Sequence, residues 1–245
     1  ISMFRAQHQS PRKKVDQTIL LIEDDRMVSS LIKSYLEKDG YQVHPCYRGD
    51  AAYEHMTKSK PALIVLDIGL PGLDGFQVCQ RLREGFQGPI MMLTAQAHDK
   101  EQVTAFNLGA DDYLVKPVSP SVLKVRIQGL LRRQPAQNVE QLPSVFQVGD
   151  LSVYPNANKC HVQGKRIKLS TFEFQLITFL IRNVGRVMTR DSIYSSLLGR
   201  QYNGSERTVD VRISRLRDKL IRQGMERAII ETVWGKGYIL NELSR

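Results

Sequence analysis

The chain has 245 residues, of which 42% are hydrophobic and 24% are charged. These proportions are ordinary for globular proteins and exclude a disordered, collagen-like or coiled-coil chain. No apolar run approaches the ~20 residues that a membrane-spanning helix needs, and no signal-peptide pattern is visible near the first residues. The cysteines, Cys46, Cys79 and Cys160, lie far apart, as is usual for reduced thiols. We therefore expect a soluble, cytoplasmic protein without a membrane partner.

The net charge of +10 is unevenly distributed along the chain. Residues 15–131 contain 12 Lys/Arg and 15 Asp/Glu, whereas residues 136–245 contain 17 Lys/Arg and 10 Asp/Glu. A mildly acidic first half followed by a basic second half indicates two modules, of which the second faces a polyanion such as nucleic acid. A basic surface without such a partner is the alternative that charge alone leaves open.

The first half alternates short apolar runs with amphipathic segments. The apolar runs occupy residues 18–22, 42–46, 62–66, 90–93 and 113–115. Helical spacing follows each of them, at residues 26–38, 50–57, 75–83, 100–108 and 120–131. Strands that are each followed by a helix predict a (βα)5 fold of the flavodoxin/CheY-like α/β class, with a parallel sheet covered on both faces.

The composition also predicts the domain boundaries. Residues 1–16 are polar and basic, which is typical of a flexible N-terminal arm. The first domain should then span residues 17–131, and a Gln- and Pro-rich linker should occupy residues 132–144. In the second domain, residues 145–245, we expect short strands, then helices at residues 171–183, 189–198 and 205–222, and a final β-hairpin.

Polar side chains follow four of the predicted strands in the first half. Glu23 and Asp24 follow the first strand, Asp67 the third, Thr94 closes the fourth and Lys116 follows the fifth. Because the carboxyl ends of parallel strands meet at one edge, we expect these side chains to lie together. Crowded carboxylates raise one another's pKa or require a cation, and such oxygen ligands suit Mg²⁺. A lysine and a hydroxyl beside the metal can then position a phosphoryl group.

Residues 17–131 resemble the receiver domain of bacterial two-component response regulators. The resemblance rests on the segments LIEDD (21–25), LDIGLPGLDG (66–75), LTA (93–95) and DYLVKP (112–117). It implies that Asp67 is the phosphoacceptor and that Lys116, before a cis Pro117, pairs with the phosphoryl oxygens. It further implies a Mg²⁺ site formed by Asp24, Asp67 and the backbone carbonyl of Gly69, with Glu23 acting through water.

The resemblance also implies a conformational switch and a dimer. Thr94 would turn to hydrogen-bond the phosphoryl group, and Tyr113 would then swing inward. Asp112 and Arg126 match one salt bridge of the usual receiver dimer. The usual charged residues of the other bridges are replaced by Gln102, Val122, Asn107 and Gln128, so we expect a weaker homodimer. Gly69 replaces a side chain that usually shields the phosphoryl group, which leaves the phosphoryl lifetime open.

Residues 205–220 predict an amphipathic helix with a dense arginine face. Its buried stripe consists of Val209, Ile213, Leu216 and Leu220. Such a helix, framed by a helix pair and a hairpin, suits a reader of the DNA major groove. An arginine-rich helix that only faces solvent fits the same pattern.

Residues 146–241 resemble the OmpR/PhoB-type winged helix-turn-helix domain, through LSTFEF (169–174), RTVDV (207–211) and GKGY (235–238). By position, the resemblance implies contacts to double-stranded promoter DNA from Arg207, Thr208, Val211, Arg212 and Arg215. Residues 198–204 match the loop that meets RNA polymerase. Trp234 replaces an arginine that commonly enters the minor groove, and Lys236 is the nearest cation that could supply the lost charge. Trp234 itself could contact the sugar-phosphate wall or pack against the body of the domain.

These features predict a phosphorylation-dependent DNA-binding transcriptional regulator. A sensor histidine kinase would phosphorylate Asp67, which promotes dimerisation and promoter binding. The protein would not be an enzyme beyond self-catalysed phosphoryl transfer and autodephosphorylation at Asp67. One alternative is a Mg²⁺-dependent phosphatase with an aspartate nucleophile, against which the glycine at position 69 argues. The other is a transcription factor that works without phosphate, against which the complete acidic cluster argues.

Overall fold

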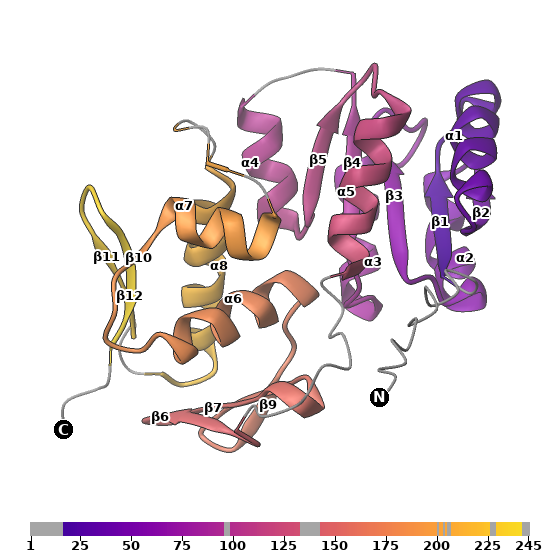
Figure 1. Cartoon of the computed structure of the whole chain (residues 1–245). Coiled ribbons are helices and arrows are strands. Elements are labelled where there is room, and N and C mark those ends of the chain that lie inside the picture. Colours follow the sequence, from indigo (N-terminus) through magenta and orange to yellow (C-terminus); the bar gives the residue numbers. More distant parts are fainter. Residues whose placement is uncertain are drawn as a thin grey trace, which may run out of the picture.

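The computed structural model describes residues 17–95, 99–132, 143–199, 201–202, 204, 207–225 and 229–241. Figure 1 shows two units, an α/β unit coloured indigo to magenta and a smaller unit coloured orange to yellow. The predicted N-terminal arm, residues 1–16, and residues 133–142 of the predicted linker lie outside the described ranges. Among the described residues, no helix is both long and apolar enough to cross a bilayer.

A five-stranded parallel sheet forms the centre of the first unit, in the order β2-β1-β3-β4-β5. The strands are β1 (Thr18–Ile22), β2 (Gln42–Cys46), β3 (Leu63–Asp67), β4 (Ile90–Thr94) and β5 (Asp112–Val115). Every residue of β3 and β4 is buried, because helices cover both faces of the sheet. The predicted α/β fold is confirmed, and β3 reaches one residue further than predicted, so that Asp67 ends the strand.

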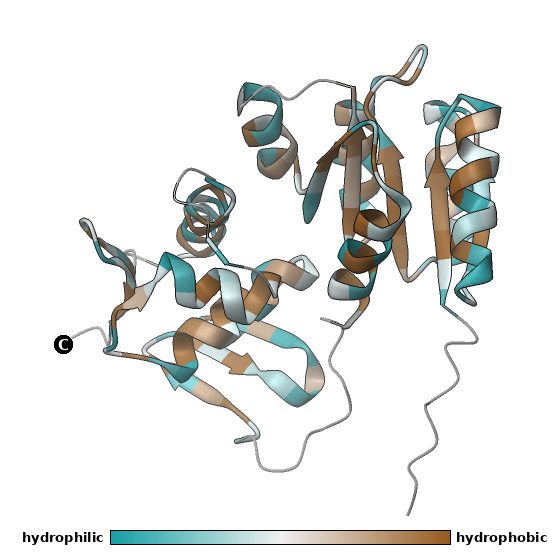
Figure 2. Cartoon of the chain, turned by 45° about the horizontal axis from the view of Figure 1, so that its top comes forward, coloured by the Kyte–Doolittle hydropathy of each residue, from teal (hydrophilic) through white to brown (hydrophobic). Residues whose placement is uncertain are grey.

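Helices lie on both sides of this sheet. They are α1 (Arg26–Lys38), α2 (Ala52–Ser59), α3 (Gly75–Gly85), α4 (Asp99–Leu108) and α5 (Pro120–Arg132). Alternate residues of β1 enter two separate cores: Ile19 and Leu21 pack with α1 and α5, whereas Leu20 and Ile22 pack with α2, α3 and α4. The colouring of Figure 2 shows the same layering, with apolar residues gathered along the strands and on the helix faces that cover them.

The second unit has its own apolar core beneath three helices. A four-stranded antiparallel sheet comes first, with β6 (Phe146–Val148), β7 (Leu151–Tyr154), β8 (Lys159–Val162) and β9 (Lys165–Ile167). The helices are α6 (Thr171–Arg182), α7 (Arg190–Ile193) and α8 (Thr208–Arg222). The start of α6 is fixed by a capping box in which Ser170 and Glu173 satisfy each other's backbone N–H groups.

The structure differs from the predicted elements at three places in this unit. The second predicted helix divides into α7 and a π-helical segment, Tyr194–Leu198. The third begins at Thr208 rather than at residue 205. A strand that the sequence did not indicate, β10 (Met188–Thr189), pairs with β12 (Gly237–Leu240), whose other neighbour is β11 (Ile230–Val233). A side chain at Gly237 would lie 2.1 Å from the carbonyl oxygen of Met188, so this sheet requires glycine there.

The loop after β3 requires glycine in the same way at Gly75. A Cβ atom at this position would lie 2.3 Å from the carbonyl oxygen of Asp67 and 2.6 Å from the Cα of Ile68. We therefore expect Gly75→Ala to lower the free energy of unfolding by ~1–3 kcal/mol, measured by urea denaturation.

Gly69→Ala is the matched control in the same loop. Its Cβ would meet Asp67 Oδ2 at 3.4 Å, an ordinary contact distance, so we expect a change within ~0.5 kcal/mol. Equal stability of the two variants would contradict this account of the loop.

Candidate functional site

The predicted acidic cluster is present at the carboxyl ends of β1 and β3. Glu23 and Asp24 directly follow β1, and Asp67 is the last residue of β3, the neighbouring strand. One carboxylate oxygen from each of the three residues lies within 4.8 Å of the other two. Glu23 and Asp67 are buried, whereas Asp24 is more open to solvent. Of the three carboxylates, that of Asp24 is therefore the most accessible to solvent.

Lys116 compensates part of this negative charge. Its Nζ atom lies 2.7 Å from Glu23 Oε2 and 2.9 Å from Asp67 Oδ1. The side chain is directed there by the backbone: Lys116 follows β5, its N–H donates to the carbonyl of Thr94 at 2.6 Å, and the Lys116-Pro117 peptide is cis. The predicted cis bond is thus present in this structure.

The environment shifts the pKa of two groups in the cluster. Burial raises the pKa of Glu23, and the charge of Asp67 acts in the same direction against the hydrogen bond from Lys116. Burial alone would lower the pKa of Lys116, but its hydrogen bonds to Glu23 and Asp67 outweigh that effect and raise it. The lysine therefore stays charged at neutral pH, and its single positive charge is shared between the carboxylates of Glu23 and Asp67.

The donor set fits a magnesium ion. Three converging carboxylates, of which that of Asp24 is more open to solvent, match the preference of this ion for oxygen ligands and water. Gly69 leaves room beside the cluster, since even an added Cβ would come no closer than 3.4 Å to Asp67 Oδ2. The residues present can therefore hold the ion.

The predicted switch residues lie next to a carboxylate that the sequence analysis did not identify. Glu101, in the first turns of α4, has Oε2 at 3.5 Å from Thr94 Oγ1 and at 3.4 Å from the Tyr113 hydroxyl. Tyr113 is only 7% exposed. The inward swing of Tyr113 that we expect after phosphorylation stays a prediction. No sequence signal marked Glu101, because a charged residue near a helix start is common.

The recognition helix α8 has the predicted buried stripe, with Val209, Ile213, Leu216 and Leu220 all buried. The opposite face departs from expectation. Thr208 and Arg212 are only 2% and 3% exposed, and Val211 packs against the core that α2, α3 and α4 cover in the first unit. Arg212 and Arg215 donate hydrogen bonds to backbone carbonyls of the same unit. The predicted DNA-contact residues Val211, Arg212 and Arg215 thus lie in the contact between the two units.

Other predicted DNA contacts remain open to solvent. Arg207, before α8, and Lys236, in the loop of the β11–β12 hairpin, are both exposed. Trp234 is 91% exposed, so its packing against the body of the domain is excluded in this structure. Of the predicted polymerase loop, residues 200 and 203 lie outside the described residues.

The two residues predicted for the dimer face pair within the chain. Arg126 of α5 lies 3.3 Å from the carboxylate of Asp112 on β5. The ion pair places both side chains beside each other at the same edge of the first unit.

Comparisons with known proteins agree with this architecture. The family model for the response regulator receiver domain matches residues 19–128, and that for the C-terminal domain of transcriptional regulatory proteins matches residues 164–240. The structure of a RitR mutant is 25% identical, with a TM-score of 0.70 over 93% of this chain and 100% of that one.

Two further solved structures have higher identity. The BeF3-activated receiver domain of RstA from Klebsiella pneumoniae is 41% identical over 47% of this chain and 99% of its own, with a TM-score of 0.46. DrrB from Thermotoga maritima, described as an OmpR/PhoB homolog, is 27% identical over 92% of this chain and 99% of its own, with a TM-score of 0.47.

A receiver domain joined to this type of C-terminal domain defines a class of transcription factor. The chain belongs to the OmpR/PhoB type of two-component response regulators, and it is a phosphorylation-dependent, DNA-binding transcriptional regulator. The resemblance found in the sequence is confirmed, including the winged-helix domain.

Magnesium should stabilise the receiver domain through the acidic cluster. Because a ligand that binds only the folded state raises the unfolding midpoint, adding Mg²⁺ should raise the Tm of the wild-type protein. We expect Asp24→Asn to lose this rise, since it removes one of the three carboxylates within 4.8 Å of one another. Differential scanning fluorimetry with and without Mg²⁺ measures the effect.

Asp25→Asn is the matched control. Asp25 caps α1 by accepting hydrogen bonds from the N–H groups of Met27 and Val28 at 2.8 and 3.1 Å, and asparagine caps helices equally well. This variant should keep the Mg²⁺ response. The same response in Asp24→Asn as in the wild type would refute the assignment.

Proposed function

We propose that Asp67 is the phosphoacceptor and that its phosphorylation by a sensor histidine kinase controls promoter binding by the C-terminal domain. The observation that carries this proposal is the position of Lys116, with Nζ 2.9 Å from Asp67 Oδ1. A carboxylate that is buried, adjacent to other carboxylates and bound by a lysine is suited to nucleophilic attack on a phosphoryl group.

The transfer needs little from the protein besides positioning and charge. A carboxylate oxygen of Asp67 attacks the phosphorus of a phosphohistidine, the bond to the imidazole nitrogen breaks, and the imidazole leaves after taking up a proton. Lys116 binds a phosphoryl oxygen, for which it gives up its ion pair with Asp67. Glu23, Asp24, Asp67 and the Gly69 carbonyl would hold a magnesium ion, which would supply further neutralisation of the phosphoryl charge. Thr94 would then donate a hydrogen bond from its hydroxyl to the phosphoryl group.

The protein catalyses this transfer and the later hydrolysis only on itself. A phosphatase acting on free phosphoesters is not favoured, because the receiver domain is joined to a DNA-binding domain. A regulator that works without phosphorylation is not favoured either, because the side chains of Glu23, Asp24 and Lys116 converge on Asp67.

The C-terminal domain would read promoter DNA through α8 and the β11–β12 wing. Arg207 and Thr208 would bind phosphates, and Arg215 would reach base edges or phosphates. Val211 would touch a thymine methyl, and Arg212 would add a charge. Lys236 would supply the cation of the wing. Phosphorylation would favour a homodimer through Asp112 and Arg126, and residues 198–204 would contact RNA polymerase in the cytoplasm.

Asp67, at the end of β3, should accept a phosphoryl group, whereas Asp74, in the loop that follows, should not. With acetyl phosphate and Mg²⁺, the wild-type protein should gain the mass of one phosphoryl group, and Asp67→Asn should gain none. Asp74→Asn is the matched control, since Asp74 caps α3 through its side chain and asparagine can do the same. Intact-protein mass spectrometry measures the gain, and a labelled Asp67→Asn variant would disprove the site.

The wing should contribute charge to DNA binding. Lys236→Ala should weaken the binding of the phosphorylated protein to every duplex and reduce the salt slope by about one unit, because one phosphate contact is lost. Lys159→Ala, an exposed lysine on the four-stranded sheet, should leave the slope unchanged. Fluorescence of Trp234, which is 91% exposed, should change on saturation with duplex. A flat spectrum with an unaltered slope for Lys236→Ala would show that the wing does not touch DNA.

A further inference from the structure

The wing and the recognition helix are joined by a polar network around Asp210. This residue lies in the first turn of α8, and its Oδ1 atom accepts one hydrogen bond from Arg190 Nε at 2.8 Å and another from the Tyr238 hydroxyl. Arg190, the first residue of α7, also donates from Nη2 to the Tyr238 hydroxyl at 3.2 Å. Since Tyr238 belongs to β12, one carboxylate oxygen joins α7, α8 and the wing.

The surroundings of Tyr238 keep its hydroxyl in place. The side chain is only 3% exposed and belongs to the apolar core of the second unit. The guanidinium carbons of Arg190 and Arg217 lie 5.1 and 5.8 Å from its ring centre, within the range of cation–π attraction. Burial and the neighbouring Asp210 raise the pKa of Tyr238, so the hydroxyl keeps its proton and donates it to the carboxylate.

The other strand of the wing is attached to α8 by Arg217. Its Nε donates to the carbonyl of Ile230 at 2.7 Å, and its Nη2 donates to Thr232 Oγ1 at 2.9 Å. Both acceptors lie on β11, which pairs with β12 in antiparallel register. Each strand of the hairpin therefore has its own polar attachment to α8, at Asp210 in the first turn and at Arg217 about two turns later.

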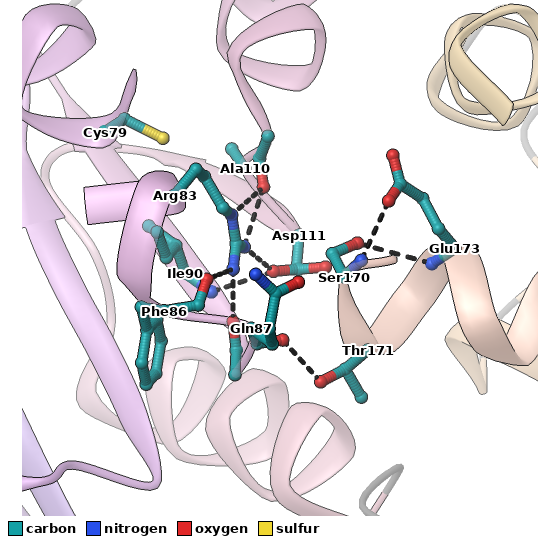
Figure 3. A network of polar contacts seen from close by, with 12 residues as sticks. Cys79, Arg83, Phe86, Gln87, Ile90, Ala110, Asp111, Ser170, Thr171 and Glu173 are labelled. Atoms are coloured by element: carbon teal, nitrogen blue, oxygen red, sulfur yellow. Dashed lines mark hydrogen bonds and ion pairs between the residues drawn. The ribbon is translucent and has the colours of Figure 1, made fainter. Parts of the chain in front are cut away.

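A comparable network surrounds Arg83 in the receiver domain, as Figure 3 shows. Arg83, on α3, donates to the carbonyl of Phe86 at 3.1 Å and binds the carboxylate of Asp111. These partners lie in the loops before β4 and β5, and neither of them is a predicted DNA contact. The network around Asp210 differs, because it joins α8 to the hairpin whose loop carries Lys236.

We propose that Asp210 is a positioning residue for DNA binding, which holds the wing in a fixed place relative to the recognition helix. The inference rests on the proposed function, because it concerns the DNA contacts assigned there to α8 and Lys236. Two reading elements that are already held at the right spacing do not have to be ordered when the duplex binds, and the free energy of that ordering is saved.

The network also explains an acidic residue at the start of a DNA-reading helix. Asp210 follows Arg207 and Thr208, which would bind phosphates, and a free carboxylate beside them would repel the same phosphates. The guanidinium of Arg190, 2.8 Å from the carboxylate, leaves the pair without net charge. Asp210 can therefore hold the wing without opposing the approach of DNA.

Hydrogen–deuterium exchange tests the attachment without DNA. Tyr238→Phe keeps the buried ring but removes the hydroxyl that binds Asp210 and Arg190. The amides of β11 and β12 should then exchange at least about threefold faster than in the wild type, because the hairpin has lost one of its two attachments. Tyr154→Phe is the matched control: Tyr154 lies on β7, in the other antiparallel sheet of the domain, so hairpin exchange should not change.

The effect of Lys236 on DNA binding separates positioning from mere stability. Tyr238→Phe alone should weaken duplex binding by the phosphorylated protein about three- to tenfold. Lys236→Ala should reduce the salt slope by about one unit in the wild type, but by less than about half a unit in Tyr238→Phe, because a displaced wing seldom makes the phosphate contact. A loss of stability alone would leave the effect of Lys236→Ala on the folded protein unchanged.

Two substitutions at Asp210 test the residue itself. Asp210→Ala removes the acceptor and should diminish the effect of Lys236→Ala as Tyr238→Phe does. Asp210→Asn keeps an oxygen that can accept both hydrogen bonds, so the effect of Lys236→Ala should be restored.

An equal effect of Lys236→Ala on the salt slope in the wild type, Asp210→Ala and Tyr238→Phe would overturn the proposal. Unchanged hairpin exchange in Tyr238→Phe would overturn it as well. If the wild type binds no duplex, or if Lys236→Ala has no effect in it, the proposed function fails at the wing. The exchange measurement still decides in that case whether the network holds the hairpin to α8.

Discussion

The guanidinium of Arg212, buried between Phe106 and Phe172, joins the two domains of this protein. A buried charge without partners destabilises a protein by several kcal/mol. For Arg212 that cost is offset by the two rings and by the hydrogen bonds to the carbonyls of Ala110 and Asp111. The receiver domain and the recognition helix therefore provide its environment jointly, and separating the domains requires another partner for the guanidinium, either water or DNA.

The acidic site, near the start of α4, also contains buried charges that need partners. Glu23 and Asp67 are buried together, and the positive charge of Lys116 offsets part of the repulsion between them. A phosphoryl group on Asp67 redistributes these charges and draws the Thr94 hydroxyl toward it. Since Glu101 touches both Thr94 and Tyr113, α4 is in contact with the phosphorylation site at its start and with Arg212 at its end.

Much of the first domain could be predicted from the sequence, because periodicity and the position of polar residues at strand ends are local signals. They placed Glu23, Asp67 and Lys116 at one edge, and the structure brings them together. The apolar stripe of α8 followed from helical spacing in the same way. The strand β10 did not, because it is two residues long and depends on the missing side chain of Gly237.

The contact between the domains could not be predicted either. Arg212 lies on the polar side of α8, and that pattern is the same whether the side chain meets water, DNA or another domain. Its burial depends on Phe106, more than a hundred positions earlier, which periodicity identifies only as a residue of α4. Glu101 could not be predicted for a related reason. Its contacts with Thr94 and Tyr113 follow from how α4 packs beside β4 and β5, which the sequence pattern does not indicate.

Hydrogen–deuterium exchange of the full chain, with and without phosphorylation, tests the central claim most directly. If α8 is docked on α4, the backbone amides of α8 and of the loop containing Ala110 and Asp111 should be protected in the unphosphorylated protein. Both segments should lose protection together on phosphorylation, before any DNA is added. Exchange of α8 that is identical in the two states would contradict the account.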